Sequence, residues 1–310
     1  MRVVVTGAAG FIGSHLCERL LAEGHDVLGI DSFTDFYPRR VKEANLDGIG
    51  EWPGFELREL DLLAPGLEEH LAGAGAVFHL AGRPGVRDDD EAAFEAGNVG
   101  TTEAVLSAAA AARVPRVLYS SSSSIYAPGR EALTEDAPCE PLSPYGRSKL
   151  RAEEVARELA SGAGIELVVL RYFTVYGPRQ RPDMAFARFI ETAINGGSPM
   201  PLLGDGSQMR DFTYVGDAVD ATVSALANGE PGIYNVAGGN PGTLRAALEQ
   251  LSAQVGRAPR LLEFPRDPRE HVNITANIDR ARRELGYEPG TDLAAGLERQ
   301  VTAALAAAAG

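Results

Sequence analysis

Short apolar runs alternate with helical patterns from the first residues of the chain onward. Continuous apolar runs typical of buried strands occur in RVVVTG (2–7), DVLGID (26–31), AVFHLAG (76–82), RVLYSSSS (116–123) and ELVVLRYFTVYG (166–177). Segments with helical periodicity separate these runs, as in GSHLCERLLAEG, GTTEAVLSAAAAA and SKLRAEEVARELAS. Strand–helix alternation with continuously apolar strands predicts a parallel sheet that is covered by helices on both faces. We therefore expect an α/β fold with a doubly wound sheet of the Rossmann type.

The sequence changes in character after Tyr176. The segments GPRQRPDM and NGGSPMPLLGDGSQMRDF are rich in Gly, Pro and Arg, and we expect them to form binding loops and no strand of a sheet core. Core-like patterns return in TYVGDAVDATVSAL and GIYNVAGG, and the Ala-rich tail after Leu293 predicts a final helix. The sequence therefore predicts a Rossmann domain of residues 1–171 and 213–237, and a smaller C-terminal α/β lobe of residues 172–212 and 238–310.

Composition excludes several classes of protein. The 310 residues include 29 basic and 43 acidic side chains, a net charge of −14, which disfavours nucleic acid and anionic membranes as partners. The two cysteines, Cys17 and Cys139, are too few for a disulfide framework or a metal-ligand set, so no metal site is predicted. Neither a secretion signal nor an apolar run of membrane-spanning length is evident, so a cytoplasmic location is expected.

Three glycines indicate a dinucleotide site. Gly7, Gly10 and Gly13 have the spacing G-x-x-G-x-x-G, at the point where the first strand turns into the first helix. Glycine permits a tight turn and close approach of a ligand, and a helix N-terminus attracts a pyrophosphate. Asp31 ends the second strand, where a carboxylate can bind the adenosine ribose hydroxyls and repel a 2′-phosphate. The sequence therefore predicts NAD as the cofactor of the Rossmann domain.

Other polar residues allow two interpretations. Tyr145 and Lys149 in SPYGRSK lie one helical turn apart on one face, which fits a catalytic pair or merely the start of a surface helix. Asp61 is near the expected adenine position, and a solvated loop carboxylate explains it nearly as well. His79 lies in an apolar run, and we interpret it as a core histidine.

Taken together, the motifs resemble the extended short-chain dehydrogenase/reductase family, in its branch of NAD-dependent nucleotide-sugar epimerases and dehydratases. The matching pieces, in family order, are TGAAGFIGSHL, HLAG, NVGTT, YSSSSSIYA, SPYGRSK, RYFTVYGPRQ and GDGSQMRDFTYV. Two further segments, DSFTDFYPRRVKEANL and RQRPDMAF, resemble UDP-glucuronate 4-epimerases, and the chain also resembles UDP-galactose 4-epimerases.

The resemblance implies catalytic roles for three residues. Tyr145 is similar to the family's acceptor of the sugar hydroxyl proton, Lys149 to its partner, and Ser122 to the residue that contacts the same hydroxyl. A neighbouring ammonium and a cationic nicotinamide favour the phenolate, so we expect the pKa of Tyr145 to be lowered. The run of serines leaves Ser121 and Ser123 as alternatives for Ser122.

The resemblance also implies two binding sites. The expected NAD site comprises Gly7, Gly10, Phe11, Ile12, Gly13, Asp31, Ser32, Thr34, Asp61, Leu62, Leu80, Ala81, Gly82, Asn98, Ser120, Tyr145, Lys149 and Tyr172. The expected substrate site comprises Arg83, Ser122, Ser123, Tyr145, Thr174, Pro201, Leu203, Arg210, Arg266 and Arg269. Within the substrate site, Arg210 is similar to an arginine that binds the pyrophosphate, and Pro201 and Leu203 lie where the family packs the uracil.

The sequence departs from the family pattern in several places, among them Val215-Gly216-Asp217 where the family has VDD. Thr174 replaces the usual Asn, which removes an amide contact near the phosphates. In RDPRE the expected arginine position holds Asp267, and either Arg266 or Arg269 could serve. The dehydratase triplet Thr-Asp-Glu is absent, and serines 122–124 occupy its positions.

We therefore expect an enzyme that uses NAD to oxidise C4 of a UDP-hexose or UDP-hexosamine transiently. The family resemblance implies a homodimer, formed through a four-helix bundle of the helix after Asn98 and the helix that starts near Tyr145. Two outcomes stay open: C4 epimerisation, or 5,6-elimination as in the UDP-GlcNAc 5,6-dehydratase of tunicamycin (antibiotic) biosynthesis. The alternative of another class is a non-catalytic dinucleotide sensor, which usually lacks the Tyr/Lys pair.

Overall fold

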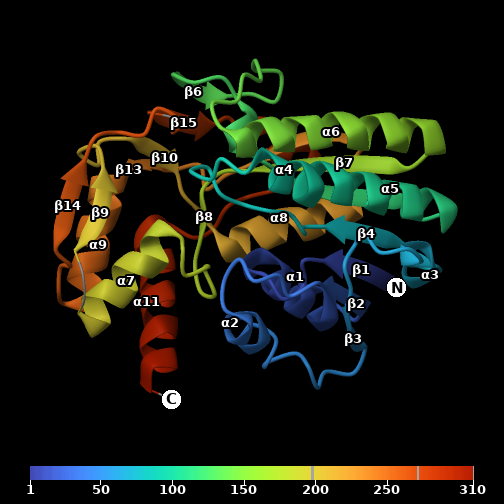
Figure 1. Ribbon diagram of the computed structural model, residues 1–310, viewed down its shortest axis with the longest axis horizontal. Helices are drawn as coiled ribbons and strands as arrows, with labels where there is room; N and C mark the ends of the chain where they lie inside the picture. The colour runs from blue at the N-terminus through green and yellow to red at the C-terminus, as the bar shows by residue number, and fades with distance from the viewer. Residues whose placement is uncertain (197–198, 271, 310) are drawn as a thin grey trace.

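A seven-stranded parallel sheet forms the centre of the computed structural model, which describes residues 1–196, 199–270 and 272–309 (Figure 1). The strand order is β12-β7-β5-β4-β1-β2-β3, and every neighbouring pair is parallel. Its strands are β1 (Arg2–Thr6), β2 (Asp26–Asp31), β3 (Phe55–Glu59), β4 (Ala76–His79), β5 (Arg116–Ser122), β7 (Glu166–Tyr172) and β12 (Gly232–Val236). The predicted doubly wound α/β fold is confirmed.

Helices cover both faces of this sheet. Successive residues of β1 point to opposite sides: Val3 and Val5 belong to one buried cluster, and Val4 belongs to the other. The first cluster includes α1 (Phe11–Ala22), α8 (Val215–Asn228) and α10 (Asp279–Leu285). The second includes α3 (Leu67–Leu71), α5 (Thr101–Ala111) and α6 (Pro144–Ala163), and Figure 1 shows α5 and α6 side by side. Burial on two sides explains why the strand sequences are continuously apolar.

Three further helical segments lie beside the sheet. They are α2 (Arg39–Ala44), α4 (Glu91–Phe94) and the π-helical turn η1 (Glu95–Gly100), which leads directly into α5; a 3₁₀ turn, η2 (Ser123–Ile125), follows β5. A π-helical turn inside a helix is rare and frequently marks a functional site. The turn η1 contains Asn98, a residue of the predicted NAD site.

Smaller sheets flank the cavity described below. One has the order β13-β10-β15-β6, and two others pair β9 with β14 and β8 with β11. Their strands are β6 (Arg130–Leu133), β8 (Val175–Tyr176), β9 (Met200–Leu203), β10 (Met209–Asp211), β11 (Thr213–Tyr214), β13 (Pro241–Thr243), β14 (Leu261–Phe264) and β15 (Asn273–Ala276). The segments expected to form binding loops and no strand of a sheet core contain β9 and β10, and both strands belong to these small sheets, outside the central sheet. Each pairs with a strand more than fifty residues further along the chain, a pairing that no local pattern reveals.

A third buried cluster joins three helices of this region. It includes residues of α7 (Ala185–Asn195), α9 (Leu244–Val255) and α11 (Leu293–Ala309), so the predicted final helix is confirmed. The division of the chain into two domains with the stated boundaries stays a prediction. Within the described residues, no helix combines the length and the apolar character that crossing a membrane requires.

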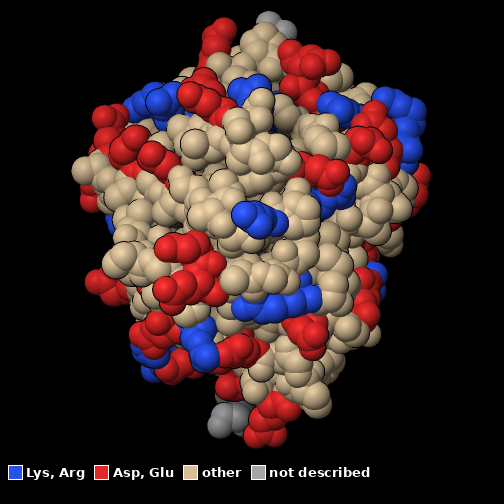
Figure 2. All heavy atoms as spheres, turned by 90° about the vertical axis from the view of Figure 1, so that its right-hand side faces the viewer, with Lys and Arg blue, Asp and Glu red and all other residues tan. Residues whose placement is uncertain are grey.

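Charge is mixed on the face that Figure 2 shows. Acidic and basic side chains are interspersed there, and no continuous basic area covers this face. The chain as a whole carries fourteen more acidic than basic residues. An anionic ligand would therefore need arginines gathered locally against a negative background.

Candidate active site

A single large cavity collects the predicted site residues. It measures about 1330 Å³ and lies where the carboxyl ends of the central strands meet the smaller sheets. Ligands of open parallel sheets bind at this edge of the fold. Every residue of the predicted NAD site lines the cavity, and so does every residue of the predicted substrate site except Arg266. Arg266 instead lies on the surface, with its Nη2 atom 4.0 Å from Oδ1 of Asp205.

The glycines of the first strand–helix turn are required by close backbone packing. Gly7 has a φ of +73°, and a Cβ atom there would lie 2.8 Å from the backbone nitrogen of Ala81. A Cβ atom on Gly13 would lie 2.1 Å from the carbonyl oxygen of Gly7. Helix α1 begins after Gly10 without a side-chain cap, so its first amides are available at the wall of the cavity. This turn fits the pyrophosphate of a dinucleotide.

Asp31 lies beside this turn and has a basic neighbour that the sequence interpretation missed. Its carboxylate accepts hydrogen bonds from the backbone of Ala9 (3.1 Å) and Phe33 (2.8 Å). Nζ of the buried Lys42 lies 3.5 Å from Asp31 Oδ1 and donates to Thr34 Oγ1 at 3.2 Å. All these contacts leave Asp31 at the cavity wall, where a ribose could reach it. No motif in RRVKEA marked Lys42, because only the turn of α2 toward β2 makes it a neighbour of Asp31.

Two other polar residues that the sequence singles out, His79 and Asp61, differ in burial. His79 is a core histidine, as predicted: its ring nitrogens lie 2.8 Å from Thr6 Oγ1 and 3.1 Å from Thr102 Oγ1, and burial lowers its pKa to about 3. Asp61 is exposed at the cavity wall and accepts a hydrogen bond from the Leu63 backbone at 3.0 Å. His79 is therefore neutral at physiological pH, whereas Asp61 stays compatible with both interpretations.

Asn98 connects the loop after β4 to the helix of the Tyr/Lys pair. Its side chain accepts a hydrogen bond from the Arg83 backbone nitrogen (2.8 Å) and donates to the Arg83 carbonyl oxygen (3.0 Å). It also donates to Ser148 Oγ at 2.8 Å, one residue before Lys149. The wider π-helical turn η1 thus presents the buried side-chain amide of Asn98, whose hydrogen bonds hold the loop after β4 and helix α6 in place relative to each other.

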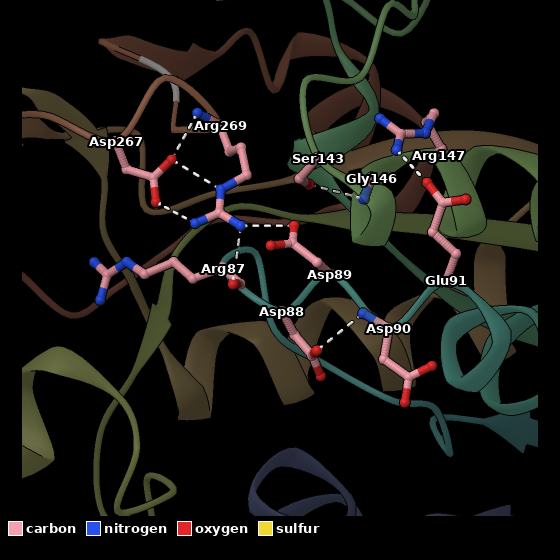
Figure 3. Close-up of polar contacts among 10 residues, drawn as sticks. All are labelled: Arg87, Asp88, Asp89, Asp90, Glu91, Ser143, Gly146, Arg147, Asp267 and Arg269. Atoms are coloured by element: carbon pink, nitrogen blue, oxygen red, sulfur yellow. Dashed lines mark hydrogen bonds and ion pairs between the residues drawn. The ribbon is translucent and has the colours of Figure 1, made fainter.

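Tyr145 and Lys149 lie in the first two turns of α6. Ser143 caps this helix by accepting a hydrogen bond from the Gly146 backbone at 3.0 Å (Figure 3). Nζ of Lys149 donates to the Ser120 carbonyl oxygen at 2.6 Å and lies 4.4 Å from the centre of the Tyr119 ring. Burial lowers the pKa of Lys149 to about 7.

The expected lowering of the Tyr145 pKa is wrong for the protein chain alone. Burial raises the pKa of this phenol, while the Ser122 side chain and the positive charge of Arg181 act in the opposite direction. The desolvation of the phenolate outweighs these two contributions, and the charge of a nicotinamide is not part of the chain.

The three neighbouring serines face different partners. Ser121 donates a short hydrogen bond to the buried Glu153, whereas the Ser122 side chain interacts with Tyr145. Ser122 Oγ also accepts a hydrogen bond from the Ser124 backbone at 3.1 Å, and Ser123 is buried beside it at the cavity wall. The contact with Tyr145 agrees with the prediction of Ser122 as the serine beside the catalytic tyrosine.

Several predicted substrate residues line the far end of the cavity. Pro201 and Leu203 lie on β9, and Thr174 lies between β7 and β8. Arg210 lies on β10 and donates to the carbonyl oxygens of Met209 (2.8 Å) and Val272 (3.2 Å), and burial lowers its pKa. A guanidinium partly removed from water beside apolar strand residues suits the pyrophosphate and base of a nucleotide.

Arg269 also reaches the cavity wall, where it joins two loops (Figure 3). Its guanidinium pairs with Asp267 and with Asp89, each at 2.7 Å, and donates to the Arg87 carbonyl oxygen at 3.0 Å. Arg87 in turn pairs with Glu270 at 2.6 Å. The loop after β4 is thereby tied to the segment before β15, and Arg269 could meet a phosphate only in competition with these two carboxylates.

Arg181 is a cavity residue that the sequence interpretation did not single out. Its guanidinium pairs with Asp183 at 3.0 Å, lies 5.8 Å from the centre of the Phe36 ring, and is close enough to Tyr145 to lower its pKa. Its segment, RQRPDMAF, resembles UDP-glucuronate 4-epimerases, and this resemblance is the signal in the sequence that marks the residue. Together with Arg83, Arg210 and Arg269, Arg181 brings local positive charge into the cavity.

Comparisons with known proteins agree with this geometry. A family model described as the NAD dependent epimerase/dehydratase family matches residues 3–237. The uncharacterized UDP-glucose epimerase YtcB of Bacillus subtilis is 37% identical, over 97% of this chain and 97% of that protein. The UDP-glucuronate 4-epimerase of Thermodesulfobacterium geofontis is 35% identical, over 96% of this chain and 94% of that protein.

A solved structure extends the likeness to three dimensions. The UDP-glucuronic acid 4-epimerase of Bacillus cereus, crystallised with UDP-glucuronic acid and NAD, has a TM-score of 0.94 and 35% sequence identity. The likeness covers 99% of this chain and 100% of that chain. The predicted cofactor is therefore confirmed at the level of the family. From its sequence match, its fold and its cavity, the chain belongs to the NAD-dependent epimerase/dehydratase family of enzymes.

Proposed function

We propose that the protein is a 4-epimerase of a UDP-hexuronic acid, which interconverts UDP-glucuronate and UDP-galacturonate. The observation that carries this proposal is the position of Arg181, at the cavity wall and within electrostatic reach of Tyr145. In a hexose, C6 is bonded to C5, the neighbour of C4. A cation near the residue that acts on the C4 hydroxyl is therefore within reach of a carboxylate at C6. The likeness to UDP-glucuronate 4-epimerases supports the same substrate.

The proposed mechanism assigns a task to each residue near the sugar. NAD⁺, when bound, supplies reversible hydride transfer at C4. Tyr145 takes the proton of the C4 hydroxyl as the C4–H bond breaks and returns it after reduction of the resulting ketone from the other face. Ser122 orients this hydroxyl, and the Lys149 ammonium favours the phenolate and hydrogen-bonds the cofactor ribose. Arg210 and Arg269 bind the pyrophosphate, and the C6 carboxylate lies against Arg181.

The serine positions favour epimerisation over dehydration. A 4,6-dehydratase of the family places an acid and a base in the positions that serines 122–124 occupy here. Ser122 and Ser123 carry hydroxyls at the cavity wall, and hydroxyls are poor bases at neutral pH. Epimerisation needs no further catalytic group, because the same tyrosine serves both half-reactions.

The proposal includes a homodimer. Helices α5 and α6 pack against each other, and the small residues Ala104, Ser107 and Ala111 of α5 are not buried in the chain and allow close approach of further helices. A second copy placed on these helices would complete a four-helix bundle. Light scattering at micromolar concentration should give twice the mass of the chain, 32.8 kDa; a monomer at this concentration would refute the dimer.

The substrate proposal is tested by offering the purified protein UDP-glucuronate, UDP-glucose, UDP-galactose and UDP-GlcNAc separately and following the anomeric signals by NMR. We expect the signals of UDP-galacturonate to grow from UDP-glucuronate faster than any other product. Tyr145→Phe and Lys149→Met in the same assay should abolish turnover. Faster conversion of an uncharged UDP-sugar would refute the assignment of a hexuronic acid.

A further inference from the structure

A buried ion pair lies behind the catalytic residues and takes no part in the chemistry described above. Glu153 on α6 is fully buried, and its partner Arg171 on β7 is 3% exposed. The guanidinium holds the carboxylate with two hydrogen bonds, from Nε to Oε1 at 3.1 Å and from Nη2 to Oε2 at 2.9 Å. The hydroxyl of Ser121 donates to the same Oε1 atom.

Stability alone does not account for this pair. Two well-packed apolar residues of similar volume usually stabilise a protein as much as a buried ion pair does, because both charges must leave water. The pair does supply one feature that an apolar pair could not. It fixes a negative charge on the same helix face as Tyr145 and Lys149, one turn beyond the lysine, since the three residues are spaced four apart.

The surroundings of Lys149 show why that charge matters. On its own helix the lysine has Tyr145 and Glu153, β5 contributes the Tyr119 ring and the Ser120 carbonyl oxygen, and β4 contributes the neutral His79. Among these neighbours Glu153 is the only carboxylate, and it opposes the loss of the lysine's proton that burial favours.

We propose that Glu153 is a positioning residue for catalysis, which keeps the ammonium group of Lys149 charged in a site that is shielded from water. Arg171 holds the carboxylate in place with two hydrogen bonds. The inference rests on the catalytic role proposed above for Lys149. It assigns to Glu153 no contact with the substrate or the cofactor.

The test is the pH dependence of kcat/KM for UDP-glucuronate, measured for the wild type and for Glu153→Gln. The carboxylate raises the pKa of Lys149, so its removal should lower this pKa and move the alkaline limb of the kcat/KM profile to lower pH. We expect a shift of about one pH unit, because a nearby opposite charge shifts a pKa by about that much. At a pH well above the limb, kcat/KM should then fall about tenfold, while the KM for the UDP-sugar at low pH changes less than about threefold.

Matched variants separate charge from structure. Glu153→Asp keeps the carboxylate and should keep the wild-type limb, whereas Ser121→Ala removes only a hydrogen bond to it and should leave the limb in place. If Glu153→Gln fails to fold because Arg171 is left unpaired, the double variant Glu153→Gln, Arg171→Gln carries two amides that can bond each other. A shift in the same direction is expected, and it should be smaller because the positive charge of Arg171 is lost as well.

An unshifted limb in the folded variant, with only a lower melting temperature, would overturn the inference and leave Glu153 a structural residue. A shift in Ser121→Ala equal to that of Glu153→Gln would also overturn it, because the hydrogen bond would then be decisive. Normal turnover by Lys149→Met would instead refute the catalytic role of Lys149 on which the inference rests. If the wild type does not convert UDP-glucuronate, the same comparison is made with UDP-glucose.

Discussion

Replacing Arg181 with glutamine tests the proposed substrate most directly. Glutamine keeps much of the length of the side chain and removes its charge. Two unit charges 4 Å apart attract each other by about 4 kcal/mol at an effective dielectric constant of about 20. The side chain of Arg181 is 21% exposed and already pairs with Asp183 at 3.0 Å, so the net contribution to a bound carboxylate must be smaller.

We set the expected loss at about 2 kcal/mol, within the range for hydrogen bonds to charged groups, or about 30-fold in kcat/KM for UDP-glucuronate. Any slow turnover of UDP-glucose should change less than about threefold, because its C6 hydroxyl carries no charge. The pH profile should change too. Arg181 lowers the pKa of Tyr145, so its loss raises this pKa and moves the acid limb of kcat/KM to higher pH.

The assay is the initial rate for each UDP-sugar, read by NMR or by chromatography of the sugar nucleotides. Arg179→Gln is the matched control. Arg179 lies in the same loop and pairs with Glu18 at 2.6 Å, so its loss should leave the preference for UDP-glucuronate over UDP-glucose unchanged. Equal losses for UDP-glucuronate and UDP-glucose in Arg181→Gln would refute the reasoning, because Arg181 would then serve the fold of the loop and not the C6 carboxylate.

Three further outcomes are expected. Tyr145→Phe should lower kcat by at least about 100-fold while NAD binding, measured by calorimetry, stays within about threefold, since the ring is kept and the base is lost; normal turnover would exclude Tyr145 as the base. Asp31→Ala should weaken NAD binding by about tenfold or more, because the ribose loses a charged acceptor and Lys42, 3.5 Å away, loses its partner; unchanged affinity would exclude the ribose contact. In deuterated water the epimer should carry no deuterium at C5, whereas mass spectrometry showing a label there, or NMR showing alkene signals, would indicate elimination.

The sequence by itself determined the features that depend on neighbouring residues. The continuous apolar strands predicted the parallel sheet, because burial on both faces leaves no polar side of a strand. The turn at Gly7 and Gly13 followed from its spacing, and the structure shows that a Cβ atom at either position would meet backbone atoms. The position of Tyr145 and Lys149 on one helix face follows from the geometry of a single helix. Each of these inferences needs only the local chain.

The tertiary structure decided which distant residues meet. Arg266 and Arg269 were equivalent candidates in the sequence, and only the path of the chain places Arg269 at the cavity wall and Arg266 on the surface. The approach of Arg181 to Tyr145 joins the loop after β8 to α6. The direction of the Tyr145 pKa also depended on the fold, because burial is a property of all the elements packed around a side chain. Spacing along the chain fixes local geometry, whereas desolvation and charge at a site are sums over residues that only folding brings together.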